Sequence, residues 1–152
     1  MERIFKEYPE EEVELMAIES YNDEFYSLKD KAKLYSKEVH GQFDFEDYKP
    51  DGATRESIQE MIRSYTCNRS QTDTKANKKS SRSHAIFKIK CPSISVAIVD
   101  LAGSERLNKA GTNLQETSSI NTSLLVLGKC IHAFRDGKVI PYRESKLTKI
   151  LG

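Results

Sequence analysis

The chain has 152 residues, of which 38% are hydrophobic and 31% are charged, and its formal net charge is +1. This length predicts one domain with a single core, and no apolar run is long enough to span a membrane. The three cysteines are far apart and form no Cys-x-x-Cys pair, which argues against a disulfide framework and a zinc site. The amino terminus has no signal-peptide pattern, so a reducing, intracellular setting is expected.

The small net charge conceals a strong asymmetry along the chain. Residues 1–60 carry 17 acidic and 8 basic side chains, whereas residues 61–152 carry 6 acidic and 16 basic ones. A half this basic predicts an acidic partner, which by charge alone is a nucleic acid, an anionic membrane or an acidic protein surface. Ordinary solvated faces remain the alternative explanation for the same charges.

The first half of the chain predicts strands followed by one helix. Residues 13–28 are strand-like with a break at Asn22-Asp23, residues 34–39 predict a shorter strand, and residues 41–52 predict an acidic, aromatic loop. A helix is predicted to begin after Thr54 as N-cap, because apolar residues recur there at i, i+3, i+4 and i+7. This stripe consists of Ile58, Met61, Ile62 and Tyr65, and the polar segment 68–77 after it predicts a surface loop.

The second half predicts a hairpin and then helices. Alternation over residues 83–90 predicts a half-buried strand, and the apolar run 96–100 is typical of a strand buried on both faces within a parallel sheet. The short turn 91–95 makes these two strands antiparallel neighbours. An apolar stripe predicts the longest helix, with Gly137 as its C-terminal cap, and another helix begins near Glu144. The stripe consists of Ile120, Leu124, Leu127, Ile131 and Phe134.

Two short motifs carry residues suited to phosphate and magnesium chemistry. Asp100 ends its strand, where ligands bind in open α/β sheets and where a carboxylate can hold hydrated Mg²⁺. Gly103 follows and lets a backbone N–H approach a phosphate, because no Cβ intervenes. The loop from Asn77 to His84 offers serine hydroxyls as Mg²⁺ ligands, and Arg82 as a partner for Glu105. Each motif by itself also fits a strand end or a solvated linker, and His84 by itself fits a surface or core histidine.

Taken together, Asn77-Lys-Lys-Ser-Ser-Arg-Ser-His84 and Asp100-Leu-Ala-Gly-Ser-Glu105 resemble switch I and switch II of the kinesin motor family. Residues 114–124 resemble the start of the switch II helix, and residues 141–148 resemble the loop and helix start that follow it. The matches cover about residues 68–151. They imply an α/β, P-loop NTPase-like kinesin motor fold with three layers and a central mixed sheet, represented here in part.

The resemblance also implies a role for each matching residue. Ser81 would ligate the Mg²⁺ of ATP, and Asp100 would hold that ion through water. Ser80 and Gly103 would lie near the γ-phosphate, while Arg82 and Glu105 would form the salt bridge between the two switches. The implied nucleotide-binding set is Arg69, Asn77, Ser80, Ser81, Asp100 and Gly103, and the implied catalytic set is Ser80, Ser81, Arg82, Gly103 and Glu105.

The same resemblance implies an acidic partner for the basic half. Kinesins present their switch II loop, the following helix and the Pro-Tyr-Arg loop to the microtubule, which implies a cytoplasmic, cytoskeletal location and neither a membrane nor a nucleic-acid partner. A nucleic-acid binder is a distant alternative, because no recognition-helix or aromatic-platform motif occurs. The implied microtubule-binding residues are Arg106, Lys109, Lys129, Tyr142, Arg143 and Lys146.

One family motif is missing from the sequence. No Gly-x-x-x-x-Gly-Lys-Ser/Thr occurs, so the loop that cradles the α- and β-phosphates is not present. We therefore expect residues 1–152 to be a partial motor domain, lacking the N-terminal P-loop part and the last strand, last helix and neck linker. By family the complete domain is an ATPase, and this chain alone is expected to be inactive. The alternative is a pseudo-motor module that attaches to microtubules without hydrolysis.

Overall fold

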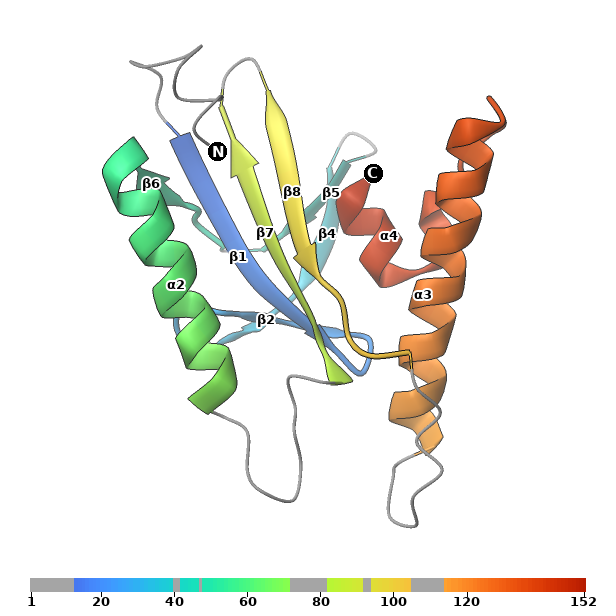
Figure 1. The fold of residues 1–152 in the computed structure, drawn as a ribbon, viewed down its shortest axis with the longest axis horizontal. Coiled ribbons are helices and arrows are strands. Elements are labelled where there is room, and N and C mark those ends of the chain that lie inside the picture. Colours follow the sequence, from blue (N-terminus) through green and yellow to red (C-terminus); the bar gives the residue numbers. More distant parts are fainter. Residues whose placement is uncertain (1–12, 40–41, 47, 72–81, 92–93, 105–113) are drawn as a thin grey trace.

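The computed structural model describes residues 13–39, 42–46, 48–71, 82–91, 94–104 and 114–152. It contains a twisted sheet with helices on both sides, shown in Figure 1. In chain order the elements are β1 (Val13–Tyr21), β2 (Glu24–Ser27), β3 (Lys33–Leu34), β4 (Ser36–Val39), β5 (Gln42–Phe45), β6 (Asp51–Ala53), α2 (Arg55–Gln71), β7 (His84–Lys90), β8 (Ser95–Asp100), α3 (Leu114–Arg135), η2 (Tyr142–Glu144) and α4 (Lys146–Leu151).

The main sheet among the described residues has the strand order β3-β2-β1-β7-β8, and β6 also pairs with β1. Every described pairing in it is antiparallel. Strand β1 pairs with β6 through its first residues and with β2 through its last ones. Where it changes partner, the backbone N–H of Ala17 donates to the Tyr48 hydroxyl at 2.9 Å, so this backbone donor stays satisfied.

Helix α2 covers one face of the sheet, with Thr54 as its cap. The Thr54 hydroxyl accepts a hydrogen bond from the Ser57 backbone N–H at 3.2 Å. The predicted apolar stripe of α2 packs on the side chains of β1 and β7 that point toward it, and this cluster is the larger of the two cores. It contains Val13, Leu15, Ala17, Leu28, Ile58, Tyr65, Ala85, Phe87, Ile89 and Cys91, with Met61 and Ile62 packed against them.

The opposite face carries α4 and the β4–β5 hairpin, and α3 lies beside them (Figure 1). Ile18 and Ile86 point to this side, as the alternation of side chains along a strand requires. Phe25, Phe43 and Phe45 pack edge to face here, with ring centroids 5.1–5.7 Å apart. Helix, sheet and helix thus form the three layers that the resemblance implies. Among the described residues the sheet is antiparallel rather than mixed, because each described strand pairs with neighbours of opposite direction.

Helix α3 ends in a Schellman motif. Gly137 has a φ of 65°, the Lys138 N–H donates to the Ala133 carbonyl at 2.8 Å, and the Gly137 N–H donates to the Phe134 carbonyl at 3.2 Å. Glycine adopts this left-handed conformation without the steric cost that a Cβ brings. The predicted cap at Gly137 is therefore confirmed.

Several local predictions are wrong. Helix α2 continues to Gln71, so residues 68–71 are helix rather than loop, because the buried side chain of Arg69 has ion pairs with Glu19 and Asp100 that hold the last turn. The predicted loop 41–52 contains β5 and the start of β6, both paired with other strands. The predicted strand 34–39 is divided between β3 and β4, which belong to different sheets.

The apolar stripe of α3 is only partly buried. Its first member, Ile120, is buried, whereas Ile131 is 61% exposed and Phe134 is 75% exposed. The stripe continues past the part of the core that α4 and the sheet supply, so its last turns face solvent. Among the described helices, none is long and apolar enough to cross a membrane.

Strand β8 is not buried on both faces as predicted. It lies at the end of the described strand order, and Ile98 is 41% exposed. Its only described strand partner is β7, because the described part of the sheet ends there. An apolar strand edge of this kind is a template for pairing with another chain.

We expect the 152-residue chain to self-associate through the edge of β8. Ile98→Lys should reduce the associated fraction severalfold, because a charge on an edge strand opposes edge-to-edge pairing. Analytical ultracentrifugation measures the effect. Val139→Lys is the matched control, since Val139 is 94% exposed but lies in the turn after α3. A monodisperse wild-type monomer would contradict the prediction.

Candidate functional site

The β7–β8 hairpin brings the described parts of the two sequence motifs, residues 82–84 and 100–104, to one end of the sheet. Its antiparallel register places Ala85 opposite Asp100, so the segment that enters β7 and the segment that leaves β8 lie side by side. Figure 1 shows this end of the hairpin, between the last turn of α2 and the start of α3. The predicted strand-turn-strand arrangement is confirmed, and it determines which side chains meet.

Arg69, in the last turn of α2, reaches this end of the hairpin. Its side chain is 5% exposed and forms an ion pair with the carboxylate of Asp100, whose side chain is 68% exposed. The same guanidinium donates to the Ser83 carbonyl. The planar guanidinium can hold two acceptors at once, so Arg69 orients the Asp100 carboxylate from the buried side.

A buried carboxylate lies behind Arg69. Glu19 on β1 is 1% exposed, and its Oε1 lies 3.8 Å from Arg69 Nε. The Ser83 hydroxyl donates to the same Oε1 at 2.7 Å. One arginine therefore contacts a buried carboxylate and an exposed one, and only the exposed one is available to a ligand.

His84 connects three elements beneath the site. It is the first residue of β7 and is 3% exposed. Its Nδ1 accepts a hydrogen bond from the Ala102 backbone N–H at 3.0 Å, and its Nε2 lies 2.9 Å from the Ser123 hydroxyl of α3. Burial, together with the charge of Arg69, lowers the pKa of His84 to about 4, so the ring is neutral near pH 7.

The other described site residues are Arg82 and Gly103, both half-buried. Arg82 lines a narrow cavity of about 10 Å³ with Asp23, His84 and Ser123. This volume is at the lower limit for one water molecule, so the cavity holds no larger ligand. Five predicted site residues, Asn77, Ser80, Ser81, Glu105 and Arg106, lie outside the described part of the chain, as does Lys109. The Arg82–Glu105 salt bridge thus stays a prediction.

The described cationic residues of the predicted docking surface lie on α3, η2 and α4, and each has an interaction within the chain. Lys129 pairs with Glu144 at 3.0 Å and Arg143 pairs with Glu38 at 3.0 Å. Lys146 donates to the backbone carbonyl of Asp23. These groups are exposed, and exposed ion pairs contribute at most about 1 kcal/mol, so an acidic partner can compete for the cations.

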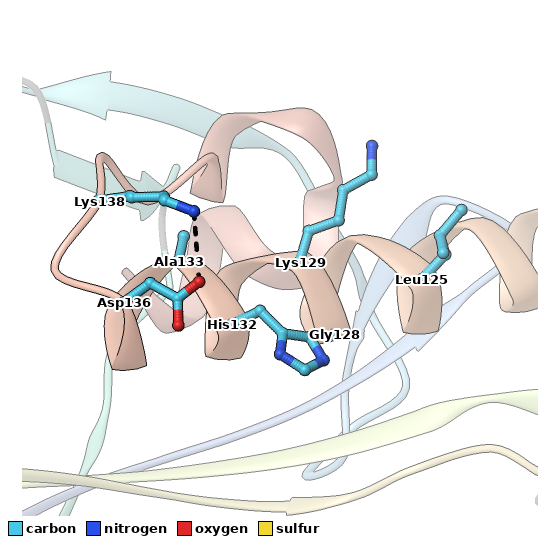
Figure 2. A pocket seen from close by; sticks show the side chains of 7 residues that line it. All are labelled: Leu125, Gly128, Lys129, His132, Ala133, Asp136 and Lys138. Atoms are coloured by element: carbon cyan, nitrogen blue, oxygen red, sulfur yellow. Dashed lines mark hydrogen bonds and ion pairs between the residues drawn. The ribbon is translucent and has the colours of Figure 1, made fainter.

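A shallow groove of about 460 Å³ runs along the outer side of α3 near its C-terminus. Figure 2 shows Lys129 and His132 leaving the helix on different sides of this groove, with Lys138 directed at Asp136. Leu125, at the other end of the groove, is 63% exposed. This face of α3 thus presents both cationic and apolar groups to solvent.

The comparisons with known proteins agree with this geometry. The family model of the kinesin motor domain matches residues 1–152. The chain belongs to the kinesin motor domain family. It is 37% identical to kinesin-like motor protein 9 of Schizosaccharomyces pombe over an alignment of 162 residues, gaps included. This alignment covers 88% of this chain and 25% of that protein. It is 42% identical to kinesin-related protein 5 of Dictyostelium discoideum over 113 residues, covering 65% of this chain and 11% of that protein.

Solved kinesin structures have the same fold. A kinesin 6 structure superposes with a TM-score of 0.73 at 28% identity, covering 93% of this chain and 46% of that one. A fast kinesin gives 0.71 at 29% identity with the same coverage. The kinesin motor fold, in part, is thus confirmed. The chain spans about half of these structures and a quarter or less of the two curated kinesins.

Three residues of this kinesin site were not predicted from the sequence. Glu19 lies in an ordinary strand pattern, and nothing in that pattern distinguishes it from a solvated glutamate. Ser83 and Ser123 lie in stretches that match the family, but their partners Glu19 and His84 come from distant elements, so local sequence holds no signal for these contacts. Among the described residues, no cluster of three or more His, Cys, Asp or Glu side chains is arranged to hold a metal.

Proposed function

We propose that this chain supplies the nucleotide-sensing switches and part of the microtubule-binding surface of an ATP-driven microtubule motor. The single observation that supports this most is the meeting of the two motifs at the end of the β7–β8 hairpin, with Asp100 oriented by Arg69. In kinesins these motifs respond to the γ-phosphate of ATP. The fast kinesin named above is described in terms of its ATPase mechanism and its interactions with microtubules.

The residues present suit magnesium with a nucleotide. The Asp100 pair with Arg69 uses Oδ2, and the side chain is 68% exposed, so a water-bound cation can reach the carboxylate. Carboxylate, hydroxyl and water oxygens are the ligands that Mg²⁺ takes in proteins, and the family resemblance would place the ion at Asp100, through water, and Ser81. A bound Mg²⁺ would neutralise charge on the phosphates of ATP.

The residues of this chain contribute by positioning the groups that surround the nucleotide. Arg69 holds the Asp100 carboxylate, and Gly103 places a backbone N–H close to where a phosphate would lie. Arg82 and Glu105 would close over the γ-phosphate and exclude water from the site, with Ser80 beside them. Phosphoryl transfer depends chiefly on such positioning and charge stabilisation, so loss of the closed geometry would lower the rate before it lowers affinity.

We expect microtubule binding to depend on the cations of α3, η2 and α4. Replacing Lys129, Arg143 and Lys146 together by alanine should weaken binding about tenfold, since three exposed charges at about 0.5 kcal/mol each amount to that factor. Co-sedimentation with microtubules over a salt series measures the affinity. Wild-type binding should weaken steeply with salt, because the charges are exposed and screened.

A charge-matched control separates this surface from general attraction. Lys29, Lys49 and Arg63 are exposed and belong to none of α3, η2 and α4, and their triple alanine variant should retain wild-type affinity. An equal loss of microtubule affinity in both triple variants would contradict a defined docking surface. Stronger binding to duplex DNA than to microtubules would contradict the microtubule partner.

The missing phosphate-loop motif favours one alternative, a module that binds microtubules without hydrolysis. The complete protein decides between the two. Microtubule-stimulated ATP hydrolysis that is abolished in Asp100→Ala supports the motor. Microtubule binding without any hydrolysis supports the module. For the 152-residue chain alone we expect weak or no binding of ATP in calorimetry.

A further inference from the structure

We propose that His84 and Ser123 form a latch that couples the segment after β8 to helix α3. His84 is a positioning residue in this latch and Ser123 is its partner. The inference rests on the proposed function only for its role in the motor cycle. The latch itself stands on the hydrogen bonds around His84.

The geometry determines where each proton lies. The Ala102 backbone N–H is a donor only, so the Nδ1 that faces it at 3.0 Å must be the unprotonated nitrogen. The neutral ring then carries its proton on Nε2 and donates to the Ser123 hydroxyl oxygen at 2.9 Å. The Ser123 hydroxyl in turn donates to the Ile120 carbonyl at 2.8 Å. The three hydrogen bonds therefore run in one direction, from the Ala102 N–H through the imidazole and the Ser123 hydroxyl to the Ile120 carbonyl. Each donor in this series has an acceptor.

The three elements that meet here differ in how firmly they are held. Strand β7 is paired on both sides, with β1 and with β8, so His84 is fixed to the centre of the sheet. Ala102 lies in the segment 101–104 that contains Gly103, the predicted γ-phosphate contact. Helix α3 packs chiefly on α4 and η2. The imidazole therefore joins residues 101–104, which are predicted to approach a phosphate, to helix α3, which carries the groove and Lys129.

The latch lies in a closed environment. Ala102, Ile120 and Ser123 are 5–6% exposed. The cavity beside His84 and Ser123 has only about 10 Å³, the lower limit for one water molecule, so breaking one hydrogen bond leaves a buried donor or acceptor poorly compensated. A displacement of Ala102 toward or away from a phosphate consequently strains the His84–Ser123 bond and biases the position of α3.

The test uses hydrogen–deuterium exchange of the complete protein, followed in peptides that contain Ala102. Ser123→Ala removes no contact of Ala102 itself, yet the latch predicts that exchange at Ala102 becomes about tenfold faster, because the ring loses its anchor on α3. Ser123→Thr keeps the hydroxyl and should restore the wild-type rate. A rescued change at this distant amide is not expected of a serine that only fills space.

The matched control is Ser145→Ala, which removes the hydroxyl cap of α4. Ser145 accepts a hydrogen bond from the Thr148 N–H at 3.1 Å and makes none of the latch contacts. If Ser123→Ala and Ser145→Ala change exchange at Ala102 equally, or if Ser123→Thr fails to restore it, the latch is overturned. His84→Asn gives a second check, because its amide can still accept from Ala102 but cannot reach Ser123, so α3 should exchange faster while Ala102 stays protected.

A second readout concerns the motor cycle. Ser123→Ala should lower the microtubule-stimulated kcat about tenfold while the KM for ATP stays near wild type, and Ser123→Thr should restore stimulation. Unchanged stimulation in Ser123→Ala overturns the role of the latch in the cycle. A complete protein without ATPase activity would contradict the proposed function instead, while the exchange of Ala102 still decides whether the latch exists.

Discussion

Arg69→Met should destabilise the fold by about 3–5 kcal/mol, the cost of removing one partner from a buried ion pair. Arg69 is 5% exposed and lies between Glu19, which is 1% exposed, and Asp100. Without the guanidinium, the Glu19 carboxylate remains buried with the Ser83 hydroxyl at 2.7 Å and no opposite charge from Arg69. Urea unfolding followed by circular dichroism measures the loss.

Two further variants separate charge from packing. In the Arg69→Met background, Glu19→Gln should restore part of the lost stability, because the buried charge is then gone. Arg69→Lys keeps the charge but not the planar fork, so its cost should lie between wild type and Arg69→Met. Arg63→Met, on an exposed face of the same helix, should change stability by less than about 0.5 kcal/mol. A cost below about 1 kcal/mol for Arg69→Met would refute a structural role for this pair.

Acid should destabilise the protein through His84. Burial and the Arg69 charge hold the pKa of His84 at about 4, against about 6.5 in an unfolded chain, while Asp23 and Asp100 act in the opposite direction. Between these two values the unfolded state binds more protons than the folded state. The free energy of unfolding therefore falls as the pH is lowered from 6.5 toward 4, and the full loss is about 3 kcal/mol.

Urea unfolding at several pH values between 7.5 and 4.5 measures this loss. His84→Asn should be less stable at pH 7.5 but should lose much less stability on acidification, since the titrating group is gone. His132→Asn is the control, because His132 is exposed on α3 and its removal should leave the acid dependence as in wild type. Parallel curves for wild type and His84→Asn would contradict the assignment.

The hairpin and the first helix could be predicted from sequence because their signals are local. The alternation over 83–90 and the short turn after it specify strand, register and partner at once, and the apolar stripe from Ile58 to Tyr65 specifies the buried face of α2. The Gly137 cap has the same origin, since the left-handed conformation at a helix end favours glycine in any protein. The bounds of these elements agree with the structure to within a few residues. The predicted burial of β7 is wrong, because this strand lies between β1 and β8 and only Lys88 and Lys90 are not buried, whereas alternation predicted a half-buried strand.

Predictions failed where a distant partner decides the outcome. Residues 68–71 are polar, yet they are helical because the buried side chain of Arg69 pairs with Glu19 and with Asp100, which is 31 residues further along the chain. The apolar run 96–100 resembles a fully buried strand, but the burial of a strand depends on which elements pack beside it, and a local sequence pattern does not show them. Ile131 and Phe134 follow helical spacing and still face solvent, because no described element lies against them.

The motifs Asn77–His84 and Asp100–Glu105, together with residues 114–124 and 141–148, identified the family from the sequence, because several matches in order are more specific than either motif by itself. Only the tertiary structure decided how Asp100 is held, and that His84 joins the segment after β8 to α3. Those contacts arise between elements far apart in the chain. Their energies depend on burial and direction, which residue types and spacing do not encode.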